Sequence, residues 1–326
     1  MITVNSLSGG KTSSYLAAHF PADHNVFSVV CIDDVRCKVK DPSFLKYAQE
    51  KLCLFVDRYG EFIASAESDR TLAVMRDLEQ FIGKRIDWVR GDSFDGIIDN
   101  GKAKYLPSWA RRYCTVEMKL KPIFEYWFQN FSEPVNMRIG FRFDEFKRME
   151  RFFNRAPNEF KVPVSQSVKI SDFGILDELD QNDILAIISK EFIKKGRQKW
   201  KSFNWRYCSF PLVEGGITKK DIDEFWLKNG FVGGNLFEER RKMDFPPISN
   251  CVGCFHKKIP TLATMAKVEA EKIQWFADQE KKGMGTWLDS KKTYQSIIEN
   301  ASDLHKETFF EYTILGQSCD SGGCID

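Results

Sequence analysis

The sequence predicts an α/β protein with a doubly wound parallel sheet, followed by a mostly helical C-terminal region that carries cysteines. Short continuous apolar runs recur up to about residue 210, as in strands that are buried on both faces. Segments with helical periodicity separate these runs, which is typical of parallel sheets because each crossover needs a helix. No internal repeat or low-complexity linker interrupts this pattern.

The individual elements follow from the same two patterns. The expected strands of the first half are 1–8, 25–34, 85–91 and 135–143. The expected helices between them are 11–20, 42–52 and 69–83, and a charged turn follows at 144–151. Farther along, the strand-like run that begins at Cys208 precedes a helix that is capped by Thr218 and ends at Gly230.

The character of the chain changes near residue 236, where a charged segment and a Pro-Pro turn precede a long helical stretch at 260–282. We therefore expect an α/β domain over 1–235 and a cysteine-bearing helical region with a tail over 236–326.

Composition limits the classes of function. The net charge is only +2 and charged residues make up 29%, so nucleic acid could bind only through a local patch. We find no basic-then-apolar leader and no apolar run that could span a bilayer, and we expect a cytoplasmic protein without membrane contact. In such a chain, nine cysteines favour metal binding or a reactive thiol over disulfides.

The loop between the first strand and the first helix is a candidate anion site. It is not a Walker A loop, because Asn5 stands where that motif has its first glycine. Glycines allow close backbone approach, and the helix N-terminus offers N–H groups at the carboxyl edge of the sheet. The alternative is a plain tight turn whose serines cap the helix. The candidate phosphate-binding residues are Ser8, Gly9, Gly10, Lys11, Thr12 and Ser13.

Two arginine positions could add to this site. Arg142 follows a buried strand, where a guanidinium can hold an oxyanion with two hydrogen bonds, and Arg112 with Arg111 could form a second anion clamp. Salt bridges to Asp144 or Glu117 are the alternative for these side chains.

Five segments in addition to the loop resemble one family in the same order. The motifs are "SLSGGKTSS", "SVVCIDD", "RRYCTVEMKLKP", "GFRFDEFKR", "FPLVEGGITKKDIDEFW" and "NCVGC". They resemble the PP-loop family of adenine-nucleotide enzymes, which includes phosphoadenosine phosphosulfate (PAPS) reductases and tRNA-thiolating enzymes. The resemblance covers roughly residues 1–260. It implies a HUP-type fold, an adenine nucleotide (PAPS, its unphosphorylated analogue or ATP), and contact of the nucleotide with the strand end at Asp33.

Cysteine spacing points to a metal centre. Cys251-x-x-Cys254 is a chelating hairpin that suits zinc or an iron–sulfur cluster. The resemblance adds Cys114, and Cys208 is our candidate for the fourth ligand, ahead of the tail cysteines. An iron–sulfur cluster is the leading hypothesis and zinc, with His256 as a nearby nitrogen ligand, the alternative. We expect Cys31 and Cys53 in the core; Cys37 is undecided.

The resemblance implies PAPS-reductase-like chemistry, in which a cysteine thiolate attacks the sulfur of a sulfonucleotide and a thiol reductant completes the cycle. We expect Cys324 and Cys319 of the tail to act in this step. The chain departs from the family in Thr12, where ATP-cleaving members have aspartate, and in Tyr113, where cluster-type reductases have a second cysteine. The family's C-terminal Glu-Cys-Gly-x-His motif is absent.

Two other hypotheses stay open. One is an ATP-dependent enzyme that thiolates or modifies tRNA or DNA. The basic, aromatic segment from Lys190 to Trp205 would bind this nucleic acid. The other is a nucleotide-binding protein that has lost catalysis.

Overall fold

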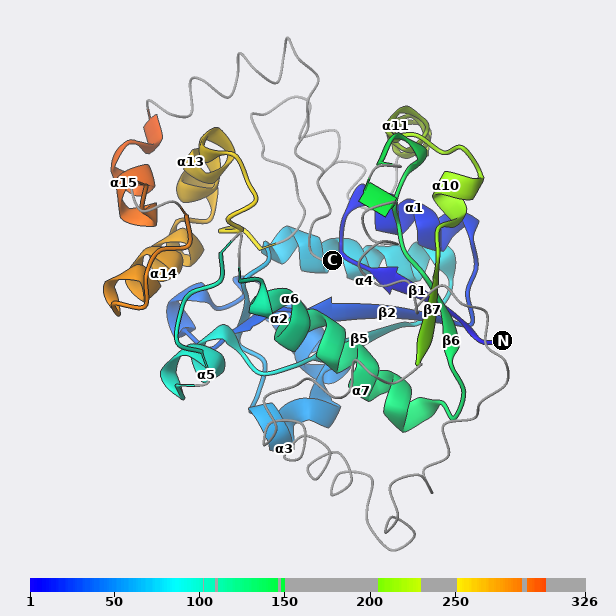
Figure 1. Ribbon diagram of the computed structural model, residues 1–326, viewed down its shortest axis with the longest axis horizontal. Coiled ribbons are helices and arrows are strands. Elements are labelled where there is room, and N and C mark those ends of the chain that lie inside the picture. Colours follow the sequence, from blue (N-terminus) through cyan, green and yellow to red (C-terminus); the bar gives the residue numbers. More distant parts are fainter. Residues whose placement is uncertain are drawn as a thin grey trace, which may run out of the picture.

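The computed structural model describes residues 1–101, 103–108, 111–145, 148–149, 205–229, 251–288 and 292–302. Within them, the predicted α/β fold is confirmed: five strands form a parallel sheet in the order β5-β2-β1-β6-β7 (Figure 1). The strands are β1 (Thr3–Leu7), β2 (His24–Val29), β5 (Ile86–Arg90), β6 (Val135–Arg138) and β7 (Arg206–Ser209).

The strand order reverses at β1, which lies between β2 and β6. Asn5 of β1 is in register with Asn25 of β2 on one side and with Arg138 of β6 on the other. The chain builds outward to β5 first and then returns to add β6 and β7 on the opposite side. Ligands of such sheets bind at the carboxyl ends of the strands where the order reverses, and here those are the ends of β1 and β6.

Alternate strand residues face two layers of helices. Phe27 and Trp88 pack on one face with α1 (Lys11–His19), α2 (Pro42–Lys51), α4 (Asp69–Ile82) and α11 (Lys219–Lys228). Val26 and Val89 pack on the other face with α7 (Lys121–Asn130), which crosses the sheet in Figure 1. This period of two, with apolar side chains on both faces, is the reason why the strands read as continuous apolar runs.

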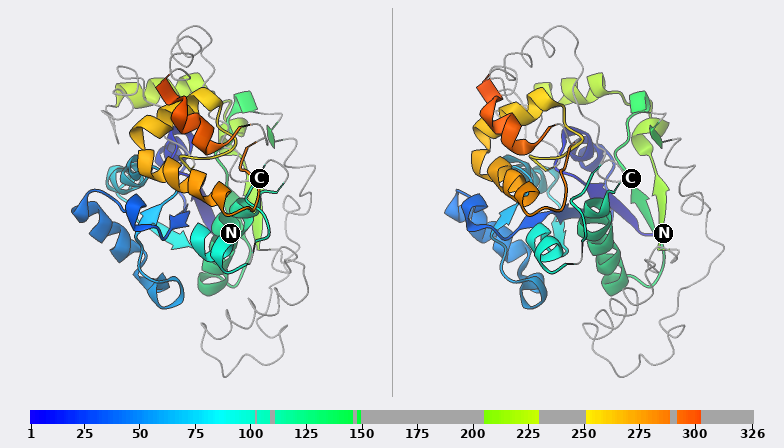
Figure 2. Two further views of the ribbon diagram at one scale, coloured as in Figure 1. Left: turned by 90° about the vertical axis from the view of Figure 1, so that its left-hand side faces the viewer. Right: turned by 60° about the vertical axis from the view of Figure 1, so that its left-hand side comes forward.

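The C-terminal region packs against the carboxyl end of β2 and the short ribbon of β3 (Cys31–Ile32) and β4 (Ala64–Ser65). Its helices are α13 (Ile259–Val268), α14 (Ala270–Lys281) and α15 (Tyr294–Glu299), and they lie together in both views of Figure 2. Val30 and Ile32 share one hydrophobic cluster with Trp275 and Phe276, so this region and the α/β part have a common core. The expected boundary at 235 lies outside the described residues.

Several predicted elements differ in extent: β2 ends at Val29 and β6 at Arg138, short of the strands expected at 25–34 and 135–143. The helical stretch expected at 260–282 is two helices, since the backbone of Glu269 is not helical, with φ −129° and ψ 46°. The Glu269 carboxylate accepts a hydrogen bond from the hydroxyl of Ser68. The strand expected near Phe210-Pro211-Leu212 ends at Ser209, and Pro211 opens the short helix α10 (Pro211–Glu214), a position at which its missing N–H costs nothing.

Among the described residues, no helix has both the length and the apolar character needed to cross a membrane.

Candidate functional site

The loop after β1 forms a closed turn that leads into α1. Gly9 has φ +75°, in the left-handed region that favours glycine, and Gly10 is the N-cap of the helix. The Ser13 hydroxyl accepts a hydrogen bond from the Ser8 N–H (3.2 Å) and donates one to the Gly10 carbonyl (3.0 Å). The serines thus stabilise the turn, and the N-terminus of α1 offers its backbone N–H groups to an anion at the carboxyl edge of the sheet. We call residues 8–13 the cradle.

The loop after β6 meets the cradle at the point where the strand order reverses. A β-carbon on Gly140 would lie 3.5 Å from Thr12 Cγ2, within ordinary contact distance. Arg142, whose side chain is buried, donates from Nη1 to the Thr12 hydroxyl at 3.3 Å. The structure therefore brings Arg142 and the cradle together, as the sequence predicts.

Both cations at the cradle already pair with carboxylates. Arg142 Nε lies 3.1 Å from Asp144 Oδ1 and 3.7 Å from Glu145 Oε2, so the salt bridge considered as an alternative is also present. Lys11 Nζ lies 2.7 Å from Asp223 Oδ1 of α11. Sequence reasoning missed Asp223, because no local pattern relates residue 11 to residue 223.

A second group of side chains converges on a cavity of about 20 Å³, beside the C-terminal helices. Cys114, Cys251 and Cys254 all line it, as do Arg112 and His256. These residues come from segments that are distant in the sequence, and the sequence predicts that the three cysteines meet. We call this cavity the thiol pocket.

Cys114 lies in α6 (Tyr113–Thr115), which continues through a π-helical turn (Val116–Leu120) into α7. Pro122 has no N–H to offer the carbonyl of Met118, and the Ser28 hydroxyl of β2 donates to that carbonyl instead, at 2.9 Å. Gly91 permits the close approach, because a β-carbon there would lie 2.7 Å from the Glu117 carbonyl oxygen.

Backbone contacts fix the Cys251–Cys254 hairpin on the other side of the pocket. The Cys254 N–H donates to the Cys251 carbonyl (3.1 Å), and the Val252 N–H donates to the Ala66 carbonyl (2.7 Å). The Tyr294 hydroxyl donates to the Gly253 carbonyl at 2.7 Å. Complete burial raises the pKa of Tyr294 well above its ordinary value, so this donor stays protonated.

The thiol pocket is electropositive on one side. The Nε and Nη2 atoms of Arg112 are buried and have no hydrogen-bond partner among the described residues, which is unusual for a guanidinium. Lys119 also lines the pocket, and its ammonium lies 3.2 Å from Oε1 of the fully buried Glu67. Glu67 neutralises the charge of Lys119, so the Arg112 guanidinium is the group at this pocket that can hold a small oxyanion.

The pocket has the donors of a metal site without their coordination geometry. Three thiols and the His256 imidazole are donors that suit zinc, and thiolates suit an iron–sulfur cluster. However, no three His, Cys, Asp or Glu side chains in the described part of the chain already lie close enough to hold a metal ion. Cys208 is in β7 and packs with Met137 in the cluster under α7, and it does not line the pocket.

The cradle and the thiol pocket lie on either side of residues 67–71, the short segment that leads into the first turn of α4. The Gly9 Cα lies against Thr71, and the Thr71 N–H donates to the Ser68 carbonyl at 2.9 Å. One residue earlier, Glu67 forms an antiparallel bridge with Cys251. The two candidate sites are therefore neighbours at the carboxyl edge of the sheet.

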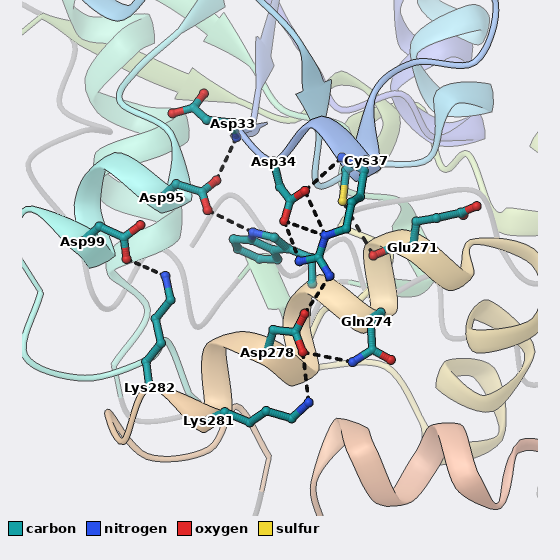
Figure 3. A network of polar contacts seen from close by, with 12 residues as sticks. Asp33, Asp34, Cys37, Asp95, Asp99, Glu271, Gln274, Asp278, Lys281 and Lys282 are labelled. Atoms are coloured by element: carbon teal, nitrogen blue, oxygen red, sulfur yellow. Dashed lines mark hydrogen bonds and ion pairs between the residues drawn. The ribbon is translucent and has the colours of Figure 1, made fainter.

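Asp33 lies in a polar network that joins the end of β3 to α14 (Figure 3). Its backbone N–H donates to Asp95 Oδ2 at 2.7 Å, and its carboxylate accepts a hydrogen bond from the Ser93 hydroxyl. The Trp275 indole donates to the other oxygen of Asp95 at 2.9 Å, and burial raises the pKa of Asp95. Asp33 is exposed, and the network holds its backbone.

The predicted tail cysteines and the basic segment are not part of either candidate site in the described residues. Cys319 and Cys324 lie outside the described residues, as does Lys190 to Asn204 of the basic segment. Trp205 is only 3% exposed and packs edge-on against Phe124, so its ring is not available to stack on a base.

The other cysteines divide by burial. Cys31 and Cys37 are buried, and the prediction that Cys53 belongs to the core is wrong. Cys53 is exposed because it opens a short 3₁₀ turn (Cys53–Phe55) at the surface.

Comparisons with known proteins give no relative: no family model, no curated protein and no solved structure matches the chain. The parallel sheet and its strand order are consistent with a Rossmann-like or HUP fold.

Proposed function

We propose that the chain is a PP-loop enzyme that binds an adenine nucleotide and transfers its sulfonyl group to a cysteine thiolate, in the manner of PAPS reductases. The observation that carries this proposal is the adjacency of an anion cradle and a cationic thiol pocket across residues 67–71. A sulfonucleotide carries phosphate and sulfonyl oxyanions on one molecule, so in this proposal its phosphate lies at the cradle and its sulfonyl group on the side of the thiol pocket.

In this proposal the cradle and Arg142 bind the phosphate, and Arg112 holds the sulfonyl oxygens. A tail thiolate, Cys324 or Cys319, attacks the sulfur. A sulfur–sulfur bond forms, the sulfur–oxygen bond to the phosphate breaks, and the nucleotide leaves with that oxygen and its electron pair. The second tail thiolate then attacks the cysteine sulfur, which forms a disulfide and releases sulfite. An external thiol reductant returns the disulfide to two thiols.

A metal centre is part of the proposal, with Cys114, Cys251 and Cys254 as its ligands and an iron–sulfur cluster ahead of zinc. Bound there, such a centre would fix the three cysteines and the two segments that carry them beside the sulfonyl group. The chain's own contribution is the Arg112 guanidinium, which orients the oxyanion, whereas the charge of Lys119 is neutralised by Glu67.

The test is the release of sulfite from PAPS, or from its unphosphorylated analogue, with dithiothreitol as reductant and without ATP. Arg112→Lys should lower kcat/KM by more than about tenfold, because lysine cannot reproduce the two-donor geometry. Arg85→Lys, on an exposed side chain that pairs with Asp87 at 2.8 Å, is the control and should retain wild-type activity. If no sulfite forms with either nucleotide under anaerobic conditions, the reductase proposal is wrong.

One observation favours the nucleic-acid enzyme as a second candidate. Tyr105 is 48% exposed, and the Arg111 guanidinium stacks 3.9 Å from its ring centroid. The stretch 100–116 around this pair has basic residues and no acidic one. Such a platform can stack on an unpaired base. Pyrophosphate release from ATP that depends on added tRNA or single-stranded DNA would favour this candidate.

A further inference from the structure

The ammonium of Lys11 at the cradle is already occupied by a carboxylate of the same chain. Lys11 Nζ and Asp223 Oδ1 are 2.7 Å apart, and the two side chains are 21% and 34% exposed. An anionic ligand at the cradle would place an oxygen against this ammonium, so it competes with Asp223 for the same cation.

The helix that carries Asp223 is firmly attached to α1 (Figure 1). The Trp226 indole, which is buried, donates to the Lys11 carbonyl at 3.0 Å. The Phe225 ring packs edge-on against Tyr15 of α1, with 5.2 Å between ring centroids. The backbone at Asp223 is thus held near Lys11, and rotation of the carboxylate is the simplest way to release the ammonium.

The same helix reaches the second cation of the cradle. Asp144 Oδ1 pairs with Arg142 Nε at 3.1 Å and also accepts the N–H of Lys219, the first residue of α11, at 3.2 Å. Both cations are therefore neutralised by carboxylates that lie on α11 or are bound to its N-terminus.

The tether makes Asp223 an effective competitor. A group held beside its partner on the same chain acts at an effective concentration of the order of millimolar. When a simple anion replaces the carboxylate, Lys11 exchanges one ion pair for a similar one. The net gain is small, because a partly exposed ion pair of this kind is weak. A ligand therefore needs further contacts, such as those of a nucleotide, to bind with a dissociation constant well below millimolar.

We infer that Asp223 is the internal counter-anion of the cradle: it occupies Lys11 until a ligand phosphate displaces it, and it sets the affinity threshold for anions. This inference rests on the proposed function, because it assumes that the cradle binds the anionic part of a nucleotide. It adds a residue of α11 to a site that the sequence motif alone confines to residues 8–13.

The test is calorimetric titration with pyrophosphate and with inorganic sulfate at constant ionic strength. Asp223→Asn should tighten both by about three- to tenfold, since it removes the competing charge and keeps the side-chain volume. Asp223→Glu keeps the charge and should stay near the wild-type affinity. Glu224→Gln makes the same change of charge one residue along α11, where the side chain pairs with Lys220 at 3.7 Å, and should have no effect. Melting temperatures check that every variant is folded.

A further variant, Lys11→Ala, separates the two ideas. If Lys11→Ala weakens binding but Asp223→Asn leaves it unchanged or weaker, Asp223 positions the lysine and the inference is overturned while the cradle stands. If Lys11→Ala changes nothing, the proposed function of the cradle fails as well. If pyrophosphate binds to Asp223→Asn but not measurably to the wild-type protein, the inference is supported. If pyrophosphate binds to neither of these two proteins, the inference is overturned.

Discussion

Gly9 and Thr71 approach each other so closely that a β-carbon on Gly9 would lie 2.2 Å from Thr71 Cγ2. The cradle and the first turn of α4 therefore fit together only with glycine at this position. Gly9 also has φ +75°, so an L-residue would be strained even without the clash.

Gly9→Ala should lower the free energy of unfolding by about 2 kcal/mol or more, from backbone strain of about 1–2 kcal/mol and from the added clash. It should also abolish measurable nucleotide binding, because the loop must move. Gly83→Ala is the control: Gly83 has φ +60° and open space around it, so this change tests strain alone and should leave binding intact. Urea unfolding and calorimetry measure the two effects. Equal stability losses in both variants would show that the contact with Thr71 is unimportant.

The thiol pocket predicts a metal-dependent stability. Cys251→Ser with Cys254→Ser should remove bound metal and lower the melting temperature by several degrees, because metal-binding energy is also folding energy. Cys208→Ser changes a buried cysteine in another cluster and should leave the metal content unchanged. Elemental analysis, sulfide assay and the visible spectrum of anaerobically purified protein distinguish iron–sulfur from zinc.

A chelator separates metal from packing in the same experiment. It should lower the melting temperature of wild-type protein and have no effect on the double variant. If the metal content and the melting temperature both survive the double substitution, the metal centre does not exist.

The strands could be predicted from sequence because burial on both faces leaves a local signal. The cradle had a local signal as well, in the glycines that follow β1. Cys114 and the Cys251–Cys254 hairpin could be associated only through a resemblance, since nothing local relates residues so far apart in the sequence.

The rest depends on contacts that no local pattern encodes. At Glu269, where the helical stretch is interrupted, the carboxylate accepts a hydrogen bond from Ser68, two hundred residues earlier in the chain. Asp223 lies on an ordinary amphipathic helix, and only packing against α1 brings it to Lys11. Cys53 has apolar neighbours in sequence, yet the turn that it opens lies at the surface. The pairing of Asp223 with Lys11 in particular depends on a tertiary contact that no local pattern encodes.

Burial predicts which cysteines react. Cys31 and Cys37 are each 2% exposed, and burial raises the pKa of both thiols to about 12. At pH 8 iodoacetamide should therefore alkylate Cys53 more than about a hundredfold faster than these two, because the thiolate is the nucleophile. Peptide mass spectrometry over a time course measures the rates. Rapid labelling of Cys37 in the folded protein would contradict its contact with the Glu271 carbonyl, which its thiol donates to at 3.6 Å.

The last prediction concerns the dependence of stability on pH. Burial raises the pKa of Asp95 above its ordinary value of 3.8, and the nearby carboxylates of Asp33 and Asp99 act in the same direction. The folded state then binds more protons at Asp95 than the unfolded state. Its contribution to stability is greatest in acid and is lost as the pH rises from about 4 through the raised pKa.

Asp95→Asn should therefore flatten part of the decline in the free energy of unfolding over this range, as measured by urea titrations at several pH values. Asparagine has one acceptor oxygen for two donors, the Asp33 N–H and the Trp275 indole, so the variant also loses a hydrogen bond. This loss lowers stability equally at every pH, and the informative quantity is therefore the slope of the free energy of unfolding against pH. Glu280, whose pKa is also raised by burial, should retain its share of the slope in the variant. Asp99→Asn, at a half-exposed side chain, is the control for a general change of charge and should alter the slope less. An unchanged slope in Asp95→Asn would mean that Asp95 is ionised in the folded protein as readily as in the unfolded chain.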